Sequence, residues 1–185
     1  MTTVPLDHPA TYEDLKNLPD DVRAEILDGE ITVVPSATPR HNLLAALLWS
    51  DLHVAASTAG YGAVQDVDVL WQPSGRVTRP DVLVVTSAVA NGTELPVHEV
   101  PVVVVEVVSP DDPGRDFVKK ARIAADAGVP EYWVVDPGTL EVYRHVLVEG
   151  RYDVQVVGTD EEQPVEGLPF PYVLRPAVLL TPQRP

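Results

Sequence analysis

The sequence PVVVVEVVSP at residues 101–110 is a run of β-branched residues that is interrupted by one carboxylate, Glu106. A run this apolar, without polar alternation, is typical of a central strand that is covered on both faces of its sheet. An unpaired carboxylate in such a strand costs a free energy comparable with the stability of a whole domain. The sequence therefore predicts a partner that compensates the charge of Glu106.

A second carboxylate, Asp81, is expected close to Glu106. It lies in RVTRPDVLVV, residues 76–85, which we interpret as one strand that becomes continuously apolar after Asp81 and runs beside the strand at 100–108. Strand parity puts Glu106 on the side of the even-numbered residues, where the end of a neighbouring strand could meet it. Two carboxylates in a poorly solvated place need a neutralising cation. Oxygen ligands without cysteine favour Mg²⁺ or Mn²⁺ over zinc.

Capping residues, turn dipeptides and hydrophobic periodicity predict the elements around these strands. Upstream, they predict a short helix at 11–18, a hairpin at 24–34 that turns at Asp28-Gly29, a long helix from Thr38 to Gly60 and a strand at 66–72. The apolar face of the long helix is expected at Leu43, Leu44, Leu47, Leu48, Leu52 and Ala55. Downstream, they predict a helix from Asp112 to Ala127 capped by Gly128, a strand at 131–136 and a hairpin around Glu149-Gly150. This order predicts an α+β fold with a mixed sheet.

The size and composition of the chain predict a single domain over residues 1–185. A chain of 185 residues with 45% apolar content can bury one core, and no stretch has the composition of a dividing linker. The proline-rich last twenty or so residues are expected to form an ordered arm or an interface rather than a domain. The absence of cysteine favours a reducing cytoplasm. The N-terminus lacks the features of a secretory signal, and the longest apolar run is too short to span a bilayer.

The charge of the chain is strongly negative but uneven. It has 13 basic and 28 acidic residues, which give a net charge of -15. Such a surface repels nucleic acid and anionic lipid at long range, which argues against a general nucleic-acid-coating protein. Six of the 13 cations nevertheless lie between residues 76 and 122, on both sides of the valine-rich strand: Arg76, Arg79, Arg115, Lys119, Lys120 and Arg122.

The helix expected after this strand brings lysines toward the carboxylates. A strand, loop and helix can return the helix across the sheet face, so Lys119 or Lys120 could reach Asp81 and Glu106. Aspartate, glutamate and lysine around a hard cation are suited to hydrolysing a phosphodiester. The metal acidifies water and neutralises the phosphate, while the lysine stabilises developing negative charge. These residues therefore form the candidate catalytic set.

Three segments, RPDVLVV, VVVVEVVSP and RDFVKKARIAADAGVPEYWVVDP, together resemble the Uma-two family of endonuclease-like proteins, long classed as a domain of unknown function. The resemblance runs from about Ala24 to Asp136, and its most specific part is AGVPEYWVVDP after an Asp-x-x-x-Lys pattern. It implies a PD-(D/E)XK restriction-endonuclease-like fold, with a mixed central sheet flanked by helices. The core of this fold is expected at about 20–157.

The resemblance also implies roles for individual residues. Asp81 and Glu106 are expected to bind the metal. In the parent fold the lysine usually lies two residues after the glutamate, where this chain has Val108. The family takes its lysine from the following helix, four residues after an aspartate and eight before a glycine. Counted from Asp116, that lysine is Lys120.

Further residues within the resemblance are possible accessories to this site. Glu25, in AEILDGEI, could add a ligand or orient water, and His41, at the opening of the long helix, could face substrate. The remaining accessory candidates are Lys119 and Asp116. The chain departs from the family at Ala124, where an aromatic residue is common, and this departure bears on packing rather than on chemistry.

Structural roles stay open for each candidate. Glu106 could be satisfied by a buried arginine or by backbone donors, and Asp81 could cap a turn. Lys120 could make only an i, i+4 ion pair with Asp116, and His41 could be bonded only locally. Three residues are expected to be structural: Asp136 as a turn former, and Tyr132 and Trp133 as apolar packing.

The sequence thus favours an Mg²⁺- or Mn²⁺-dependent endonuclease that hydrolyses phosphodiester bonds in DNA. We expect a homodimer, since cutting a duplex requires two phosphodiester bonds to be broken, and we expect no membrane and no other protein partner. One alternative is a binding or assembly module that keeps the nuclease fold with weak or no catalysis, which would suit the acidic surface and Ala124. Another is a hydrolase of small phosphodiesters.

Overall fold

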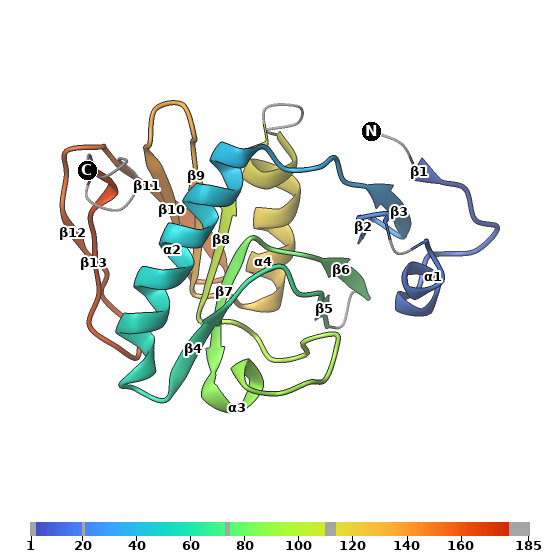
Figure 1. Cartoon of the computed structure of the whole chain (residues 1–185), viewed down its shortest axis with the longest axis horizontal. Coiled ribbons are helices and arrows are strands. Elements are labelled where there is room, and N and C mark those ends of the chain that lie inside the picture. The colour runs from blue at the N-terminus through green and yellow to red at the C-terminus, as the bar shows by residue number, and fades with distance from the viewer. Residues whose placement is uncertain (1–2, 20, 73–74, 110–113, 178–185) are drawn as a thin grey trace.

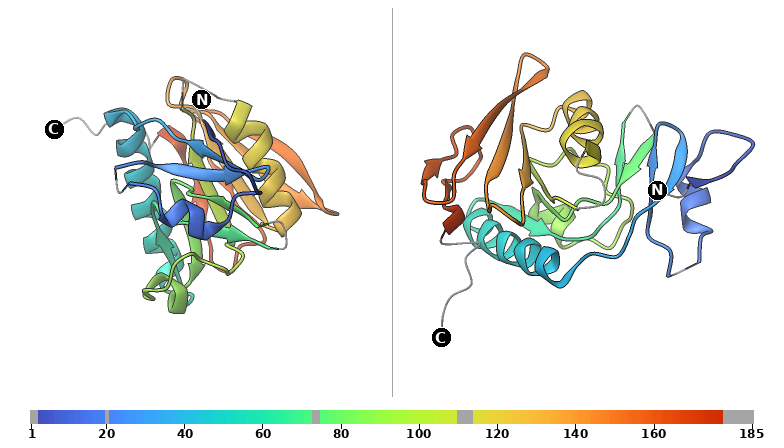
Figure 2. Two further views of the ribbon diagram at one scale, coloured as in Figure 1. Left: turned by 90° about the vertical axis from the view of Figure 1, so that its right-hand side faces the viewer. Right: turned by 90° about the horizontal axis from the view of Figure 1, so that it is seen from above.

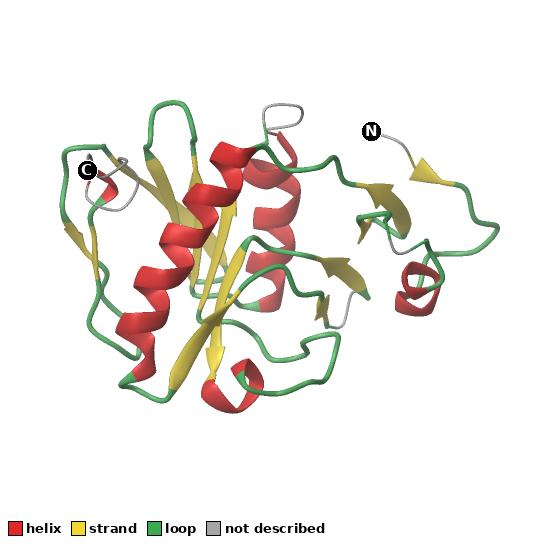
Figure 3. Ribbon diagram, viewed as in Figure 1, coloured by secondary structure: helices red, strands yellow, loops and turns green. Residues whose placement is uncertain are grey.

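The structure is a computed structural model that describes residues 3–19, 21–72, 75–109 and 114–177, with Arg115 and Asp116 described only in their backbone. Two larger β-sheets, a two-stranded pair and the helices beside them form the molecule (Figures 1 and 3). The helical elements are α1 (Tyr12–Lys16), α2 (Pro39–Ser57), α3 (Ser87–Ala90), the π-helical segment η1 (Arg115–Lys120) and α4 (Ala121–Ala127). No helix in the described part of the chain is long and apolar enough to cross a membrane.

The larger sheet has six strands in the order β11-β10-β9-β8-β7-β4. The bounds are β4 (Tyr61–Val64), β7 (Val82–Thr86), β8 (Val103–Val107), β9 (Glu131–Val135), β10 (Val142–Val148) and β11 (Arg151–Val157). Only the β8–β9 pair is parallel, so the sheet is mixed. In Figure 2, α2 and α4 lie on opposite faces of this sheet. This is an α+β architecture, as the sequence predicts.

The smaller sheet has the order β1-β3-β2-β6-β5 and lies with α1 at one end of the molecule (Figure 1). Its strands are β1 (Thr3–Val4), β2 (Ala24–Leu27), β3 (Glu30–Val33), β5 (Val69–Trp71) and β6 (Arg76–Thr78). A short pair, β12 (Gln163–Pro164) with β13 (Val173–Leu174), follows the larger sheet. The nearby Phe170 and Tyr172 are buried in the core on the α2 face, so the described part of this proline-rich segment packs against the rest of the molecule.

The valine-rich strand lies in the middle of the larger sheet. All five residues of β8 are buried. Its odd-numbered residues pack with α2, whereas Val104 packs with α4. Since successive side chains of a strand alternate between faces, Glu106 points to the α4 face, with Val104 and Val108. The predicted central strand is confirmed, and so is its parity within β8 and at Val108. The notion that Val102 shares the side of Glu106 is wrong, because Val102 precedes β8 and packs with the α2 face.

The local signals for helix starts and hairpins are also confirmed. Thr11 and Asp14 form a capping box on α1, and the Thr38 side chain caps α2. Both predicted hairpin turns have two residues with positive φ: Asp28 and Gly29 at 51° and 82°, and Glu149 and Gly150 at 48° and 78°. Glycine adopts this conformation without steric cost, which explains its place in both turns.

Four expectations need correction or lie outside the described residues. RVTRPDVLVV is not one strand, since it divides into β6 in the smaller sheet and β7 in the larger one. Pro80 has no N–H for a sheet ladder, and the N–H of Arg79 bonds a side chain, so the chain leaves one sheet there and enters the other. Leu43 is 47% exposed, and α2 ends at Ser57 instead of reaching Gly60. The predicted helix start at Asp112 lies outside the described residues.

Candidate active site

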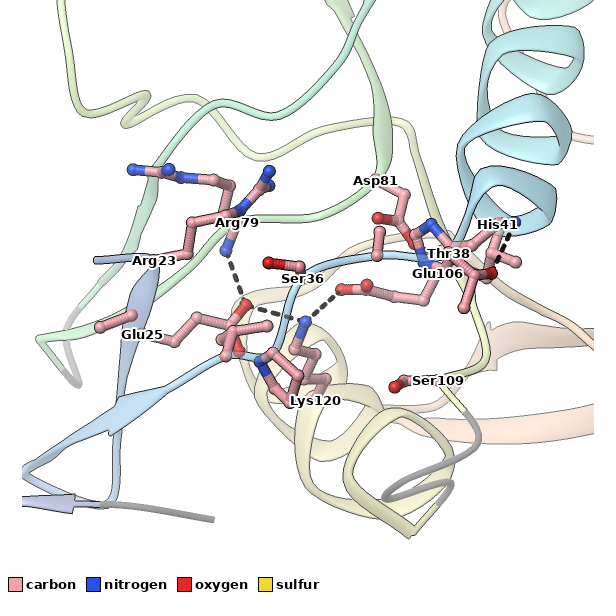
Figure 4. A pocket seen from close by; sticks show the side chains of 15 residues that line it. Arg23, Glu25, Ser36, Thr38, His41, Arg79, Asp81, Glu106, Ser109 and Lys120 are labelled. Carbon is pink, nitrogen blue, oxygen red and sulfur yellow. Dashed lines mark hydrogen bonds and ion pairs between the residues drawn. The ribbon is translucent and has the colours of Figure 1, made fainter. Parts of the chain in front are cut away.

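A pocket at the meeting point of the two sheets brings together most of the candidate residues (Figure 4). One wall comes from β2 in the smaller sheet, and another from the ends of β7 and β8 in the larger sheet. The segment between β3 and α2 and the start of α2 line the remainder, and η1 contributes one lysine. The lining residues are Arg23, Ala24, Glu25, 34–38, His41, Arg79, Asp81, Glu106, Val107, Ser109 and Lys120.

Asp81 and Glu106 meet because β7 and β8 are antiparallel neighbours. Val82 pairs with Val105, and the same register continued by one residue places Asp81 across from Glu106. The Asp81 carboxylate is fixed by the backbone, since its Oδ2 accepts a hydrogen bond of 2.7 Å from the N–H of Val107. The side chain of Asp81 is 18% exposed, whereas that of Glu106 is 4% exposed. The pair thus joins a buried carboxylate to one that reaches the pocket.

Lys120 is the cation that compensates Glu106. Its Nζ lies 3.0 Å from Oε1 of Glu106 and 2.8 Å from Oε1 of Glu25. The Lys120 side chain is only 4% exposed. Since η1 ends at Lys120 over the α4 face of the sheet, it brings the ammonium group to the face on which Glu106 lies. The lysine indicated by the family spacing therefore lies in the site.

Glu25 connects the two sheets at the site. Its Oε1 accepts hydrogen bonds from Lys120 Nζ and from the backbone N–H of Arg79, the latter at 2.9 Å. Its Oε2 is buried and has no hydrogen-bond partner among the residues that the structure describes. A buried carboxylate oxygen without a donor is costly, so this atom is an available acceptor for a ligand.

His41 contacts Asp81 and is also bonded locally. Its Nε2 lies 3.1 Å from Oδ2 of Asp81, and its backbone N–H donates to Oγ1 of Thr38. Burial lowers the pKa of His41, but the hydrogen bond and the charge of Asp81 outweigh burial, so the pKa is raised above its usual value. His41 thus orients Asp81 from the opening turn of α2.

The other candidates lie outside the pocket lining or have structural roles. Lys119 is exposed, and the side chain of Asp116 lies outside the described parts of the chain. Ala124 is buried against the larger sheet. The expected structural residues are confirmed: Asp136 accepts hydrogen bonds from the N–H groups of the next turn, and Tyr132 and Trp133 are core residues.

Several residues of the pocket lining have no sequence pattern that assigns them to the site. Arg79 was noted only as one of the cations near the valine-rich strand, and Arg23, Ser36 and Ser109 carried no signal. Arg23 adjoins the β2 segment that contains Glu25, so its neighbourhood could have suggested it. Ser36 lies in the connection between β3 and α2, where no pattern distinguishes one serine from another.

The donors at this site fit a hard dication such as Mg²⁺. In the described parts of the chain, no group of three or more histidine, aspartate or glutamate side chains is placed to hold a metal ion. Two carboxylates, Asp81 and Glu106, nevertheless line one pocket, and Glu25 adds an oxygen without a donor. Mg²⁺ typically binds one or two carboxylates and completes its shell with water and substrate phosphate. The residues present match that pattern better than they match a closed zinc site.

Comparisons with known proteins identify the family and the fold of the chain. The model of the Uma2 family, described as "Putative restriction endonuclease", matches residues 9–177. A crystal structure titled as "a putative nuclease belonging to DUF820 from Anabaena variabilis ATCC 29413" is similar to this chain with a TM-score of 0.70 and 19% sequence identity, over 85% of this chain and 89% of that one. A search of curated proteins found no match. The fold is therefore restriction-endonuclease-like.

Proposed function

Because the chain belongs to the Uma2 family, whose description and structural neighbour indicate a nuclease, we propose that it is a metal-dependent endonuclease acting on DNA. The observation that carries the proposal is the meeting of Asp81 and Glu106 on adjoining strands, with Lys120 against Glu106. Carboxylates and a lysine in one pocket provide for both a dication and a polyanionic substrate. Structural ion pairs alone do not require a pocket.

Each residue has a specific task in this proposal. Asp81 and Glu106 would hold Mg²⁺ or Mn²⁺, which when bound would acidify water and neutralise phosphate charge. Lys120 donates from Nζ and stabilises the negative charge that develops on the phosphate oxygens. Glu25 holds the ammonium group of Lys120 in place, and His41 holds the carboxylate of Asp81.

The direct test is a cleavage assay with matched variants. We expect the purified protein to cut plasmid and linear DNA in Mg²⁺ or Mn²⁺ and not in EDTA. Asp81→Asn and Glu106→Gln should melt like the wild type but lose cleavage. Asp153→Asn, an exposed carboxylate on β11, provides the control, because it has the same charge change away from the pocket and detects a contaminating nuclease.

Parallel substrates separate the proposal from its alternatives. RNA and a chromogenic phosphodiester are assayed under the same conditions as DNA. Faster turnover of the small diester than of DNA would favour the small-molecule hydrolase. A protein that is inert on every nucleic acid, and that shows no Mn²⁺ binding by calorimetry, would contradict the endonuclease and favour a non-catalytic module.

A further inference from the structure

Two arginines, Arg23 and Arg79, lie on the side of the pocket away from His41 and Asp81 (Figure 4). The pocket lining contains three permanent cations, and the third, Lys120, is 4% exposed and bound to carboxylates. The side chains of Arg23 and Arg79 are 46% and 30% exposed. Among the described residues, these two arginines are therefore the most exposed cations of the pocket lining.

Each arginine is anchored in a way that leaves donors available. Nε of Arg79 donates to Oδ1 of Asp68 at 2.8 Å, and Nη2 of Arg23 pairs with Oδ1 of Asp66. The two terminal nitrogens of Arg79 have no partner among the described residues. A planar guanidinium held at Nε still presents its terminal donors, which suit two phosphate oxygens.

The anchor of Arg79 is itself built into the fold. Asp68 is buried, and its Oδ2 accepts a hydrogen bond of 3.2 Å from the hydroxyl of Tyr12 in α1. The backbone of Arg79 is bound to Glu25, the residue that also binds Lys120. The guanidinium is thus oriented by Asp68 and Tyr12, and the backbone of Arg79 is linked through Glu25 to the candidate catalytic lysine.

The charge of the chain makes such cations necessary for a polyanionic substrate. The net charge is -15, and Asp81, Glu106 and Glu25 add negative charge at the pocket. A DNA backbone approaching this pocket is repelled unless neighbouring phosphates meet cations. Contacts to phosphates on each side of a reacting bond also fix its position relative to the catalytic groups.

We propose that Arg23 and Arg79 form a phosphate clamp for the DNA backbone beside the bond to be cut. This proposal rests on the proposed function and adds to it the path of the substrate. A second pocket shares Arg23 and Arg79 with the first and continues to the C-terminal end of α1 and the residues after it, where Lys16 and Leu18 line it; Asp68, the anchor of Arg79, lines it as well. In this proposal the DNA strand runs from Asp81 and Glu106, past the two arginines, toward α1.

Binding without cleavage isolates the clamp. The anisotropy of a fluorescein-labelled DNA duplex is titrated with protein in EDTA, at several salt concentrations. Arg23→Gln and Arg79→Gln should each weaken binding about tenfold and reduce the slope of log affinity against log salt by about one. Arg79→Lys keeps the charge but loses the planar donors, so we expect an intermediate loss of affinity.

Arg175→Gln is the matched control. Its guanidinium is 45% exposed and pairs with Glu162 at 3.2 Å, beside β13 at the far end of the molecule from α1. The Arg175→Gln substitution removes the same charge from a similar surface ion pair. Thermal melts identify any variant that fails to fold, and Arg23→Gln, which breaks only an exposed pair, keeps the test available if Arg79→Gln unfolds.

The outcomes for the clamp and for the endonuclease are separate. The clamp is supported if Arg23→Gln and Arg79→Gln both bind DNA more weakly than Arg175→Gln does. This holds even if the protein cuts no DNA and the proposed endonuclease function is wrong. Equal binding by all three variants, or a wild type that does not bind the duplex, overturns the clamp. If all variants bind equally and still cleave DNA, the clamp is overturned and the proposed endonuclease function is retained.

Discussion

Two buried clusters of opposite charges lie at opposite ends of the central strands β8 and β9. At one end, Lys120 lies between Glu106 and Glu25; at the other, Arg144 of β10 pairs with Glu131 of β9. The register of the parallel pair places Glu131 beside Val103, at the end of β8 away from Glu106. All five charged residues are at most 4% exposed. Burial alone therefore does not distinguish the two clusters.

The clusters differ in charge balance and in hydrogen bonding. Arg144 and Glu131 cancel one for one, and both oxygens of Glu131 are bonded, with Trp133 Nε1 as a further donor to Oε2. At the other cluster, one lysine faces two carboxylates, and Glu25 keeps an oxygen without a donor among the described residues. That cluster also lines the pocket. Excess negative charge at a pocket, rather than a buried charge, is thus the sign of a functional site.

The largest expected effect is a loss of catalytic activity, without a loss of stability, when the pocket cluster is substituted. Glu106→Gln removes a carboxylate that we propose binds the metal, so we expect kcat for DNA cleavage to fall at least about 10³-fold. Glu131→Gln makes the same chemical change at the other cluster and should leave kcat of the folded enzyme near that of the wild type. Both rate constants are measured in Mg²⁺ below the melting temperature of each variant. Equal losses of activity would contradict the contrast.

The second-largest expected effect is a loss of stability when the Arg144–Glu131 pair is broken. Arg144→Met leaves Glu131 buried and unpaired, which should cost about 3 kcal/mol of unfolding free energy. Urea denaturation measures this loss. The double variant Arg144→Met with Glu131→Leu replaces the ion pair by apolar side chains and should recover most of the stability. If the double variant is no more stable than the single one, repacking rather than an unpaired charge explains the loss.

The third effect sharpens the contrast through metal affinity. Lys120→Met removes the cation that pairs with Glu106 and would compete with a bound metal ion for that carboxylate. The carboxylates should therefore bind Mn²⁺ about tenfold more tightly, which corresponds to roughly 1.4 kcal/mol of binding free energy. Cleavage should fall in the same variant, because the phosphate loses its donor. Calorimetry in Mn²⁺ measures the affinity. Weaker binding would show that Lys120 organises the carboxylates and does not compete with the metal.

Part of this site is readable from local sequence. Glu106 is identified by the apolar run around it, and Asp81 by its place before the next apolar strand, since both signals depend on strand periodicity. Lys120 depended on the family spacing, because an i, i+4 pair with Asp116 has the same local pattern. The central strands and the capped helices were likewise predicted from local signals.

The rest depends on contacts between distant segments. The bond of Glu25 to Lys120 forms only when the smaller sheet packs against η1, and its bond to Arg79 forms only when β2 pairs with β6. No periodicity encodes either contact. The division of 76–85 between two sheets has the same cause. Glu131 gave no signal at all, because a polar residue that opens a strand has the same pattern whether it is exposed or buried.

The smallest expected effect concerns two histidines that belong to the two regions. Burial among Tyr132 and Tyr152 lowers the pKa of His145 on β10, whereas Asp81 raises that of His41. Below pH about 6.5, His145 is protonated in the unfolded chain but stays neutral in the folded protein, because its pKa is lowered there. The unfolded state therefore gains stability from this residue as pH falls through that value, and the folded protein becomes less stable.

His145→Phe should therefore gain stability relative to the wild type as pH is lowered from neutrality. His41→Gln should show the opposite trend, because the stabilisation from protonated His41 is present below pH about 6.5 and disappears as pH rises through its raised pKa. Urea denaturation in EDTA across this pH range measures both differences. Since acid titration of the carboxylates is common to all three proteins, it cancels in the comparison with the wild type. Trends of the same sign would mean that the two regions do not differ in the electrostatic environment they give a histidine.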